Sequence, residues 1–186
     1  MGEIRMPAPV KFFCGILAVS EEFLARGCAE LESLCGPVDL ESGVIPFDFT
    51  DYYREEMGPS LLRKFVTFAP LGDPGGLADL KVKTNAIEAR LGAAAPGGSR
   101  RPVNLDPGYM TPDQVVLATT KACAHRIYLG QGIHAEVTLN FRKKRCAFFE
   151  WTYPDYRTPA YTEFFLRVRT ALRDRQIRAE PAVDRG

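Results

Sequence analysis

The stretch VKFFCGILAVSEEFLARGCAELESLCGP, residues 10–37, decides the fold class, because a strand pattern is followed directly by a helix pattern. Val10 to Ala18 is a short run of aliphatic and aromatic residues, which is typical of a buried strand. Ser20 is a suitable N-cap, and the glutamates after it lie where the helix dipole favours acids. Apolar residues at helical spacing continue until Gly36-Pro37 ends the helix. The stretch predicts a β-α unit.

The chain downstream of this unit predicts a second one. Residues 38–47 and 61–69 have the composition of strands, and Asp73-Pro74 opens a second helix, with proline at a tolerated first-turn position. Residues 102–105 are predicted as a fourth strand, ended by a turn at Asp106-Pro107-Gly108. The order β-α-β-β-α-β is that of the ferredoxin-like arrangement.

The remaining sequence predicts additions to this core. A short helix is expected from Thr111-Pro112 and a β-hairpin with arms at residues 125–129 and 133–141, where apolar and polar residues alternate in the second arm. A last strand at residues 146–149 and a final helix from Thr158-Pro159 complete the pattern. We therefore predict an α+β fold: one domain with a ferredoxin-like βαββαβ core, extended by a β-hairpin and a C-terminal helix.

The limits of the domain follow from composition. The domain is predicted to span residues 1–176, and the charged residues 177–186 are predicted to be a frayed tail. The small, glycine-rich residues 93–99 are expected to form a mobile loop within the domain.

Composition and charge exclude several classes of protein. The 186 residues are 46% hydrophobic and carry 23 acidic against 24 basic side chains, so neither a nucleic acid nor a membrane is required as a partner. The longest apolar run is too short to span a bilayer, and the N-terminus lacks a secretory signal. The 5 cysteines show no C-x-x-C spacing, which favours reduced thiols in a cytoplasmic protein over a zinc site.

Several phrases resemble a known family. DFTDYYREEMG (48–58), NLDPGY (104–109), TTK and HRIYL (119–129) and WTYPDYR (151–157) are similar to the bacterial family called domain of unknown function 4416, and the similarity extends over nearly the whole chain. The resemblance implies a stand-alone bacterial protein. It carries over no catalytic residue.

Charged and aromatic residues in these phrases gather at the ends of the predicted elements, which suggests a site. Histidine is a common general acid and base in catalysis, and Asp106 could orient His125, so these two are the candidate catalytic residues. Lys121 and Arg126 could anchor a phosphate or carboxylate. The predicted ligand-binding residues are Asp48, Tyr52, Asn104, Tyr109, Lys121 and Arg126.

Structural interpretations of the same residues stay open. NLDPGY has the composition of a turn, and DFTDYY that of a capped helical turn. His125 could be a structural histidine held by hydrogen bonds. WTYPDYR could be a segment that covers the core. Cys123 and His125 would share one face of a strand and could pair as thiolate and imidazole. Asp48, Asp106 and Glu136 could hold a hard cation, but no spacing demands a metal, so we predict none, and the cofactor is left unknown.

Two functions fit these observations. The first is a protein that binds a small anionic or nucleotide-like ligand, with hydrolysis or group transfer as an open extension, so that enzymatic activity is left undecided. The second is a non-enzymatic module that binds RNA or a protein partner through a sheet face and the RKKR segment (142–145). The phosphate loop, the dinucleotide fingerprint, the nucleophile elbow and the H-E-x-x-H motif are all missing from the sequence. We favour the small ligand over RNA and leave the oligomeric state open.

Overall fold

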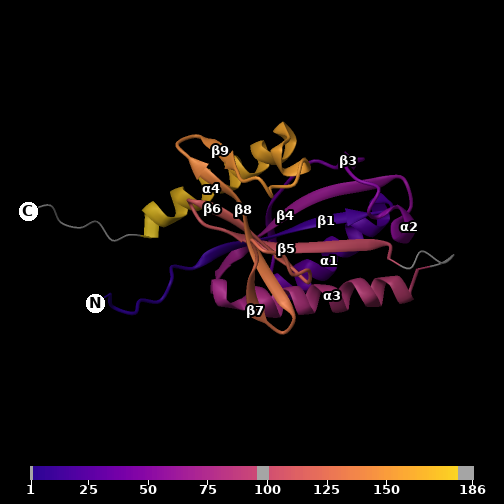
Figure 1. Cartoon of the computed structure of the whole chain (residues 1–186), viewed down its shortest axis with the longest axis horizontal. Helices are drawn as coiled ribbons and strands as arrows, with labels where there is room; N and C mark the ends of the chain where they lie inside the picture. The colour runs from indigo at the N-terminus through magenta and orange to yellow at the C-terminus, as the bar shows by residue number, and fades with distance from the viewer. Residues whose placement is uncertain (1, 96–100, 180–186) are drawn as a thin grey trace, which may run out of the picture.

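A nine-stranded antiparallel sheet is the frame of the chain in the computed structural model, which describes residues 2–95 and 101–179 (Figure 1). The strands follow the order β2-β4-β1-β5-β6-β8-β7, with β3 on β4 and β9 on β8. They are β1 (Val10–Ala18), β2 (Val38–Glu41), β3 (Ile45–Phe47), β4 (Leu61–Gly72), β5 (Val103–Met110), β6 (Gln114–Thr119), β7 (Ile127–Gly130), β8 (Ile133–Arg142) and β9 (Arg145–Phe148). The described residues form one α+β domain.

The helices cover both faces of the sheet. They are α1 (Glu21–Cys35), α2 (Arg54–Met57), α3 (Leu77–Ala93) and α4 (Pro159–Ala179), with short 3₁₀ turns η1 (Pro74–Gly76) and η2 (Asp155–Arg157). Figure 1 shows α1 and α3 on one side of the sheet and α4 on the other. Successive residues of β1 alternate between these layers: Phe13 packs with Phe165 of α4, whereas Cys14 and Ile16 belong to the cluster formed with α1 and α3.

The β-α unit predicted from residues 10–37 is confirmed. The strand has the predicted bounds, and α1 begins after Ser20, whose hydroxyl accepts a hydrogen bond from the Phe23 amide at 3.4 Å. The helix ends at Gly36, which has φ +92°, a left-handed conformation that glycine adopts without a Cβ penalty. The second unit and the C-terminal helix are confirmed as elements, although the single strand predicted for residues 38–47 is two strands, β2 and β3. Three corrections apply to the residues between them.

The predicted turn at Asp106-Pro107-Gly108 is wrong, because these residues lie inside β5. Asp106 is paired with Gly15 of β1, and Pro107 is paired with Cys14. The local turn preference of this sequence is overridden by eight residues of antiparallel pairing with the central strand. Gly108 is required for space: a Cβ there would lie 2.3 Å from the Val116 carbonyl oxygen and 2.7 Å from the Phe13 ring.

The predicted helix at Thr111-Pro112 is also wrong, because this segment is the turn between β5 and β6. The Thr111 hydroxyl accepts hydrogen bonds from the Asp113 and Gln114 amides at 3.1 and 3.2 Å. The Thr111 amide in turn donates to the Gln114 carbonyl at 3.0 Å. Threonine supplies the same acceptor in a turn as at a helix N-cap, so the local signal did not distinguish them.

The first arm of the predicted hairpin starts later than expected. β7 begins at Ile127, and residues 121–126 have no strand conformation. Cys123 and His125 therefore do not share a strand face, and the exposed Cys123 loses the geometric argument for a thiolate-imidazole pair. The second arm and the Gly130-Gln131-Gly132 turn match the prediction, with Gln131 at φ +55°.

The sheet opens into a fork between β5 and β6. The two strands pair only at Gly108–Met110 of β5, and Pro107 has no amide hydrogen with which to extend the ladder. Beyond it, α3 takes the place of a strand: Lys81 Nζ donates to the Leu105 carbonyl at 2.7 Å, and the Leu105 amide donates to Glu88 at 2.7 Å. These contacts satisfy the backbone amide and carbonyl of Leu105, so β5 needs no strand partner there and a space remains between β5 and β6.

The C-terminal helix overlaps the predicted tail. α4 continues to Ala179 and so includes the first residues of the predicted 177–186 tail, whereas residues 180–186 lie outside the described part. Most of the predicted 93–99 loop also lies outside it. No helix within residues 2–95 and 101–179 is both long and apolar enough to cross a membrane.

Candidate functional site

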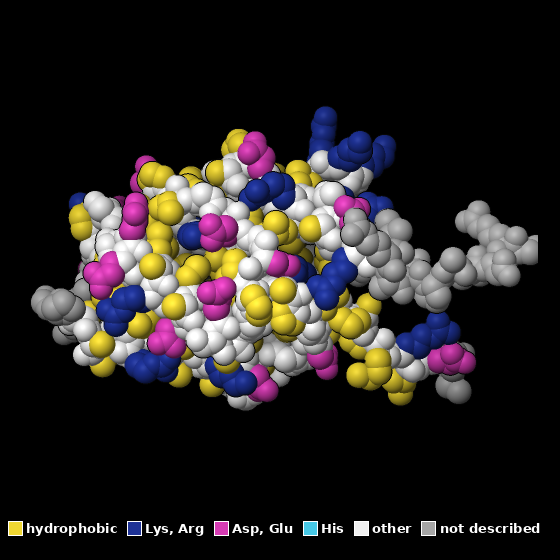
Figure 2. Space-filling view, turned by 180° about the vertical axis from the view of Figure 1, so that it is seen from behind, with side chains coloured by type: hydrophobic (Ala, Val, Ile, Leu, Met, Phe, Trp, Pro, Cys, Tyr) yellow, Lys and Arg dark blue, Asp and Glu magenta, His cyan; other side chains and the backbone are white. Residues whose placement is uncertain are grey.

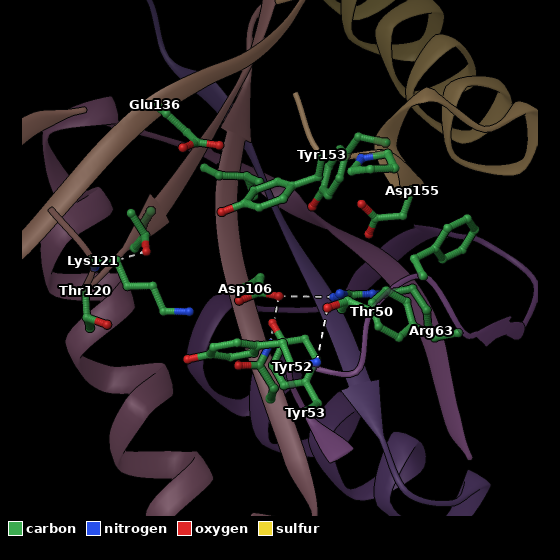
Figure 3. A pocket seen from close by; sticks show the side chains of 18 of the residues that line it. Thr50, Tyr52, Tyr53, Arg63, Asp106, Thr120, Lys121, Glu136, Tyr153 and Asp155 are labelled. Carbon is green, nitrogen blue, oxygen red and sulfur yellow. Dashed lines mark hydrogen bonds and ion pairs between the residues drawn. The ribbon is translucent and has the colours of Figure 1, made fainter. Parts of the chain in front are cut away.

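A cavity of about 530 Å³ occupies the fork of the sheet (Figure 3). This volume lies within the range of small-molecule sites in proteins. Its walls come from β3 and the segment after it, β4, α3, β5, the end of β6, β8 and the η2 turn. The lining residues are Phe47, Phe49, Thr50, Tyr52, Tyr53, Arg63, Lys81, Arg101, Asn104, Asp106, Leu117, Ala118, Thr119, Thr120, Lys121, Glu136, Tyr153, Pro154, Asp155 and Tyr156.

Asp106 lies at the centre of a buried charge network in this wall. Its Oδ2 accepts hydrogen bonds from Arg63 Nη1 at 3.1 Å and from Asn104 Nδ2 at 2.7 Å, while Lys81 Nζ is 3.9 Å from Oδ1. Burial alone would raise the pKa of Asp106, but Lys81 and Arg63 outweigh it, so the pKa lies below its usual value. Asp106 is therefore an ionised acceptor at neutral pH.

Arg101 closes the network toward the end of α3. Its guanidinium donates to Glu88 Oε2 at 2.7 and 3.1 Å and also to the Asn104 side-chain oxygen. Glu88 thus receives Arg101 on one oxygen and the Leu105 amide on the other. The network holds Arg63, Lys81, Arg101 and Asn104 in fixed positions around the cavity, which is the preorganisation that a binding site needs.

The pKa of Asp155 is displaced in the direction opposite to that of Asp106. It is buried in the η2 turn and also faces the cavity. Burial raises the pKa of Asp155, and Arg63 only partly offsets the effect. Two carboxyl groups with pKa values displaced in opposite directions therefore line one cavity.

Lys121 differs from the other cations of the cavity. Arg63, Lys81 and Arg101 are each within 4.0 Å of a carboxylate, whereas the Lys121 ammonium has no acidic partner among the described residues. It lies 3.7 Å from the centroid of the Tyr52 ring, a cation–π contact at the exposed rim of the cavity. Arg63 also retains a buried Nε with no hydrogen-bond partner in the described structure.

Aromatic rings form much of the remaining wall. Tyr52 and Tyr53 meet edge to face with centroids 5.0 Å apart, and Phe47 packs on Tyr53 at 6.1 Å. Tyr153 and Tyr156 contribute from the opposite side. Figure 3 shows Tyr52 and Tyr153 on different sides of the opening. Planar apolar surface is therefore placed beside charged groups.

His125 and Arg126 lie behind the cavity wall and do not line it. His125 Nε2 is 3.0 Å from Glu136 Oε2, and Arg126 Nε donates to the same oxygen at 2.7 Å. Arg126 also donates to the Tyr153 hydroxyl at 2.8 Å, and the His125 ring stacks on Trp151 at 4.9 Å. Both residues thus act on the cavity through residues that line it: His125 through Glu136, and Arg126 through Glu136, Tyr153 and the Lys121 carbonyl, to which it donates at 2.9 Å.

The structure separates the residues predicted from sequence into three groups. Tyr52, Asn104, Asp106 and Lys121 line the cavity together, His125 and Arg126 support it from behind, and two others lie elsewhere. Asp48 is exposed at the end of β3 and is not among the lining residues. Tyr109 packs against Phe12 at 6.4 Å, next to a separate apolar cluster. Their predicted ligand-binding roles have no support from position.

The structure does not bring Asp48, Asp106 and Glu136 together in one cation site. Asp48 is not among the residues that line the cavity with Asp106 and Glu136. Nowhere in the described ranges do three or more His, Cys, Asp or Glu side chains form a group that could hold a metal ion. We assign no metal to this cavity.

The predicted site does not include Arg63, Lys81 or Arg101, although the sequence held a signal for the first two. Arg63 is in the same alternating face of β4 as Leu61 and Phe65, so a charge lies on a buried face. Lys81 and Glu88 share the buried side of α3 with Leu77 and Leu91. Charges within an apolar stripe mark positions that need a partner inside the protein.

Comparisons with known proteins place the site in a family context. The model of a family described as Domain of unknown function (DUF4416) matches residues 8–171, a range that contains every residue lining the cavity. No match was found among curated proteins or among solved structures.

Proposed function

The chain belongs to the DUF4416 family, and for this member we propose that the cavity in the fork of the sheet binds a small anionic or nucleotide-like ligand. The observation that carries the proposal is the Lys121 ammonium, which enters the cavity beside the Tyr52 ring without an acidic partner in the described structure. Arg63 Nε adds a second donor without a partner there. A phosphate or carboxylate would satisfy such donors.

The aromatic wall supports a ligand with a planar part. Bases stack on tyrosine and phenylalanine rings, and such stacking tolerates different bases. Tyr52 is 58% exposed at the rim, and the part of its ring that Lys121 and Tyr53 do not cover is open to a base. A ligand with an anionic group and an aromatic group would thus use both parts of the cavity.

Hydrolysis or group transfer is part of this proposal, because Asp106 and Asp155 have pKa values displaced in opposite directions in one cavity. Such a pair can divide the roles of base and acid. We propose Asp106 as an ionised orienting group, and His125 as a positioning residue that acts through Glu136. Turnover of any ligand that binds, followed by phosphate release or chromatography, tests this extension.

We also propose that the core is ferredoxin-like. The support is the order β2-β4-β1-β5, all antiparallel, with α1 and α3 as the crossovers on one face. In this proposal β6 to β9 are an added half-sheet, and the cavity lies where core and addition separate.

Thermal shift of the purified protein tests the binding proposal. Inorganic phosphate, ribose 5-phosphate and nucleoside mono- and triphosphates are compared, each with and without EDTA. A ligand at a hundred times its Kd should add about 2.7 kcal/mol of stability, which corresponds to roughly 5–10 °C for a domain of this size. The absence of a shift with every compound would show that the proposal is wrong.

Replacing Lys121 by alanine should weaken the binding of such a ligand about 10- to 100-fold, because a hydrogen bond to a charged group is lost. Folding should be little affected, since Lys121 is exposed and its ammonium contacts the exposed Tyr52 ring. Isothermal titration calorimetry with the best ligand measures the change.

The matched control is Lys144→Ala, an exposed lysine on the β8–β9 turn outside the cavity. It should leave small-ligand binding unchanged. If both variants lose affinity equally, the attraction is a general one to basic surface. The same control examines the alternative function: if RNA binds and Lys144→Ala weakens it with a flatter salt dependence, the basic turn is an RNA contact instead.

Figure 2 shows how charged side chains are distributed on one face of the molecule. Basic, acidic and hydrophobic side chains are intermixed over most of this face, but a cluster of Lys and Arg side chains projects at its upper right. An anion could be attracted to this cluster as well as to the cavity, which is why a control variant outside the cavity accompanies Lys121→Ala.

A further inference from the structure

Glu136 is an acidic side chain of the cavity that has a buried oxygen without a hydrogen-bond partner in the described residues. It extends from β8, where it is paired with Leu117 of β6, and its residue is only 3% exposed. Figure 3 shows its carboxylate pointing from the strand toward the cavity. The two carboxylate oxygens have different surroundings, and this difference indicates what the cavity accepts.

One oxygen of Glu136 is fully engaged. Oε2 accepts the hydrogen bond from Arg126 Nε at 2.7 Å and lies 3.0 Å from His125 Nε2. Arg126 is itself fixed by donating to the Lys121 carbonyl at 2.9 Å and to the Tyr153 hydroxyl. The side chain therefore cannot turn to exchange its oxygens without breaking this ion pair.

The other oxygen has no partner. Oε1 of Glu136 is buried and accepts no hydrogen bond from any side chain or backbone group in the described residues. Leaving a charged acceptor buried and unpaired costs free energy, so native proteins rarely do it without a functional reason. A carboxylate oxygen only accepts, so the missing group must be an N–H or O–H donor.

We propose that the cavity takes a nucleotide whose base carries an exocyclic amino group, and that this amino group donates a hydrogen bond to Oε1 of Glu136. The inference rests on the proposed function and adds the ligand class. Lys121 and Arg63 would meet the phosphate, the tyrosine rings would contact the base, and Glu136 would select the donor on it. Each of these side chains lines the same cavity.

The test compares nucleotides that differ by the amino group alone. The pairs are GMP with IMP and AMP with purine riboside 5′-monophosphate, and ribose 5-phosphate supplies the phosphate and sugar without a base. At least one amino-bearing nucleotide should bind about tenfold more tightly than its deamino partner. Equal affinities within both pairs would overturn the proposal, and this arm needs no variant.

The variant Glu136→Gln identifies the group responsible. Because Arg126 donates to Oε2, the glutamine carbonyl oxygen keeps that place and the NH₂ group faces the cavity. The preference for the amino-bearing nucleotide should then fall to one or below, while the affinity for ribose 5-phosphate stays within twofold. The control is Glu163→Gln, an exposed glutamate of α4, which should change neither.

The outcomes separate this inference from the proposed function. If neither ribose 5-phosphate nor any nucleotide binds, the proposed function is wrong, and this inference with it. If phosphates bind and depend on Lys121, but the amino preference survives in Glu136→Gln, only the role of Glu136 is wrong. An equal loss of ribose 5-phosphate and nucleotide in Glu136→Gln would mean that Glu136 maintains the shape of the cavity and selects nothing.

Discussion

Replacing Asp106 by asparagine is expected to reduce the free energy of unfolding by about 3 kcal/mol at pH 7, because it leaves buried cations without their counter-charge. Arg63 is 3% exposed and Lys81 is 4% exposed, and both are held by this carboxylate. Asparagine has nearly the same shape but no charge. Urea unfolding followed by circular dichroism measures the loss.

The pH dependence of this loss has a definite sign. The pKa of Asp106 is lowered in the folded state, so its ionisation stabilises the fold above the unfolded pKa of about 3.9. That contribution disappears as the pH falls through the lowered folded value. The difference between wild type and Asp106→Asn should therefore be constant from pH 5 to 7 and shrink below about pH 4.

The control for Asp106→Asn is Asp51→Asn, which removes an aspartate from an ion pair with Arg54 at 3.1 Å. Both partners of that pair are largely exposed, so its loss should cost less than 1 kcal/mol. If Asp106→Asn unfolds like wild type but no longer responds to ligand, Asp106 serves binding or catalysis and contributes little to stability.

Replacing Gly108 by alanine is expected to destabilise the protein as much as Asp106→Asn does, reducing the free energy of unfolding by about 3 kcal/mol or more. The new Cβ would lie 2.3 Å from the Val116 carbonyl oxygen, a backbone atom of the paired strand that cannot move without opening the ladder. The Phe13 ring, buried against α4, blocks the other direction. Insertion of even one methyl group into a packed core is costly when no neighbour can yield.

Gly43→Ala provides the matched control for Gly108→Ala, because a Cβ at Gly43 meets nothing within 4 Å. It should change the stability by less than about 0.5 kcal/mol. Gly108 also joins the last paired residues of β5 to the open fork, so any folded Gly108→Ala protein should bind ligand more weakly. Wild-type stability in Gly108→Ala would show that β5 and β6 can separate further without loss.

Local sequence patterns were sufficient to predict a helix or strand wherever its own residues show the spacing, alternation or cap of that element. The helical spacing and Ser20 N-cap gave α1 with its correct start, and the alternation in residues 133–141 gave β8. For the cavity, the sequence alone indicated Tyr52, Asn104, Asp106 and Lys121, because their charged and aromatic side chains adjoin predicted element ends. These inferences needed only neighbours in the chain.

The interior of the fork required long-range pairing, which no local pattern contains. Asp-Pro-Gly has the composition of a turn, and only the partner strand β1 holds it extended. Arg63 and Asp106 are 43 residues apart in sequence and meet because β4 and β5 flank β1 on its two sides.

The sequence by itself therefore determined the α+β class, the order of most elements and the chemical types available for a site. The tertiary structure decided which of them meet. His125 contacts Glu136 and does not line the cavity, and Asp48 and Tyr109 lie outside the lining. Arg63, Lys81 and Arg101 are part of the lining. The reason is physical. Backbone propensity acts over a few residues, whereas a cavity is formed by side chains whose distances depend on strand register and helix packing.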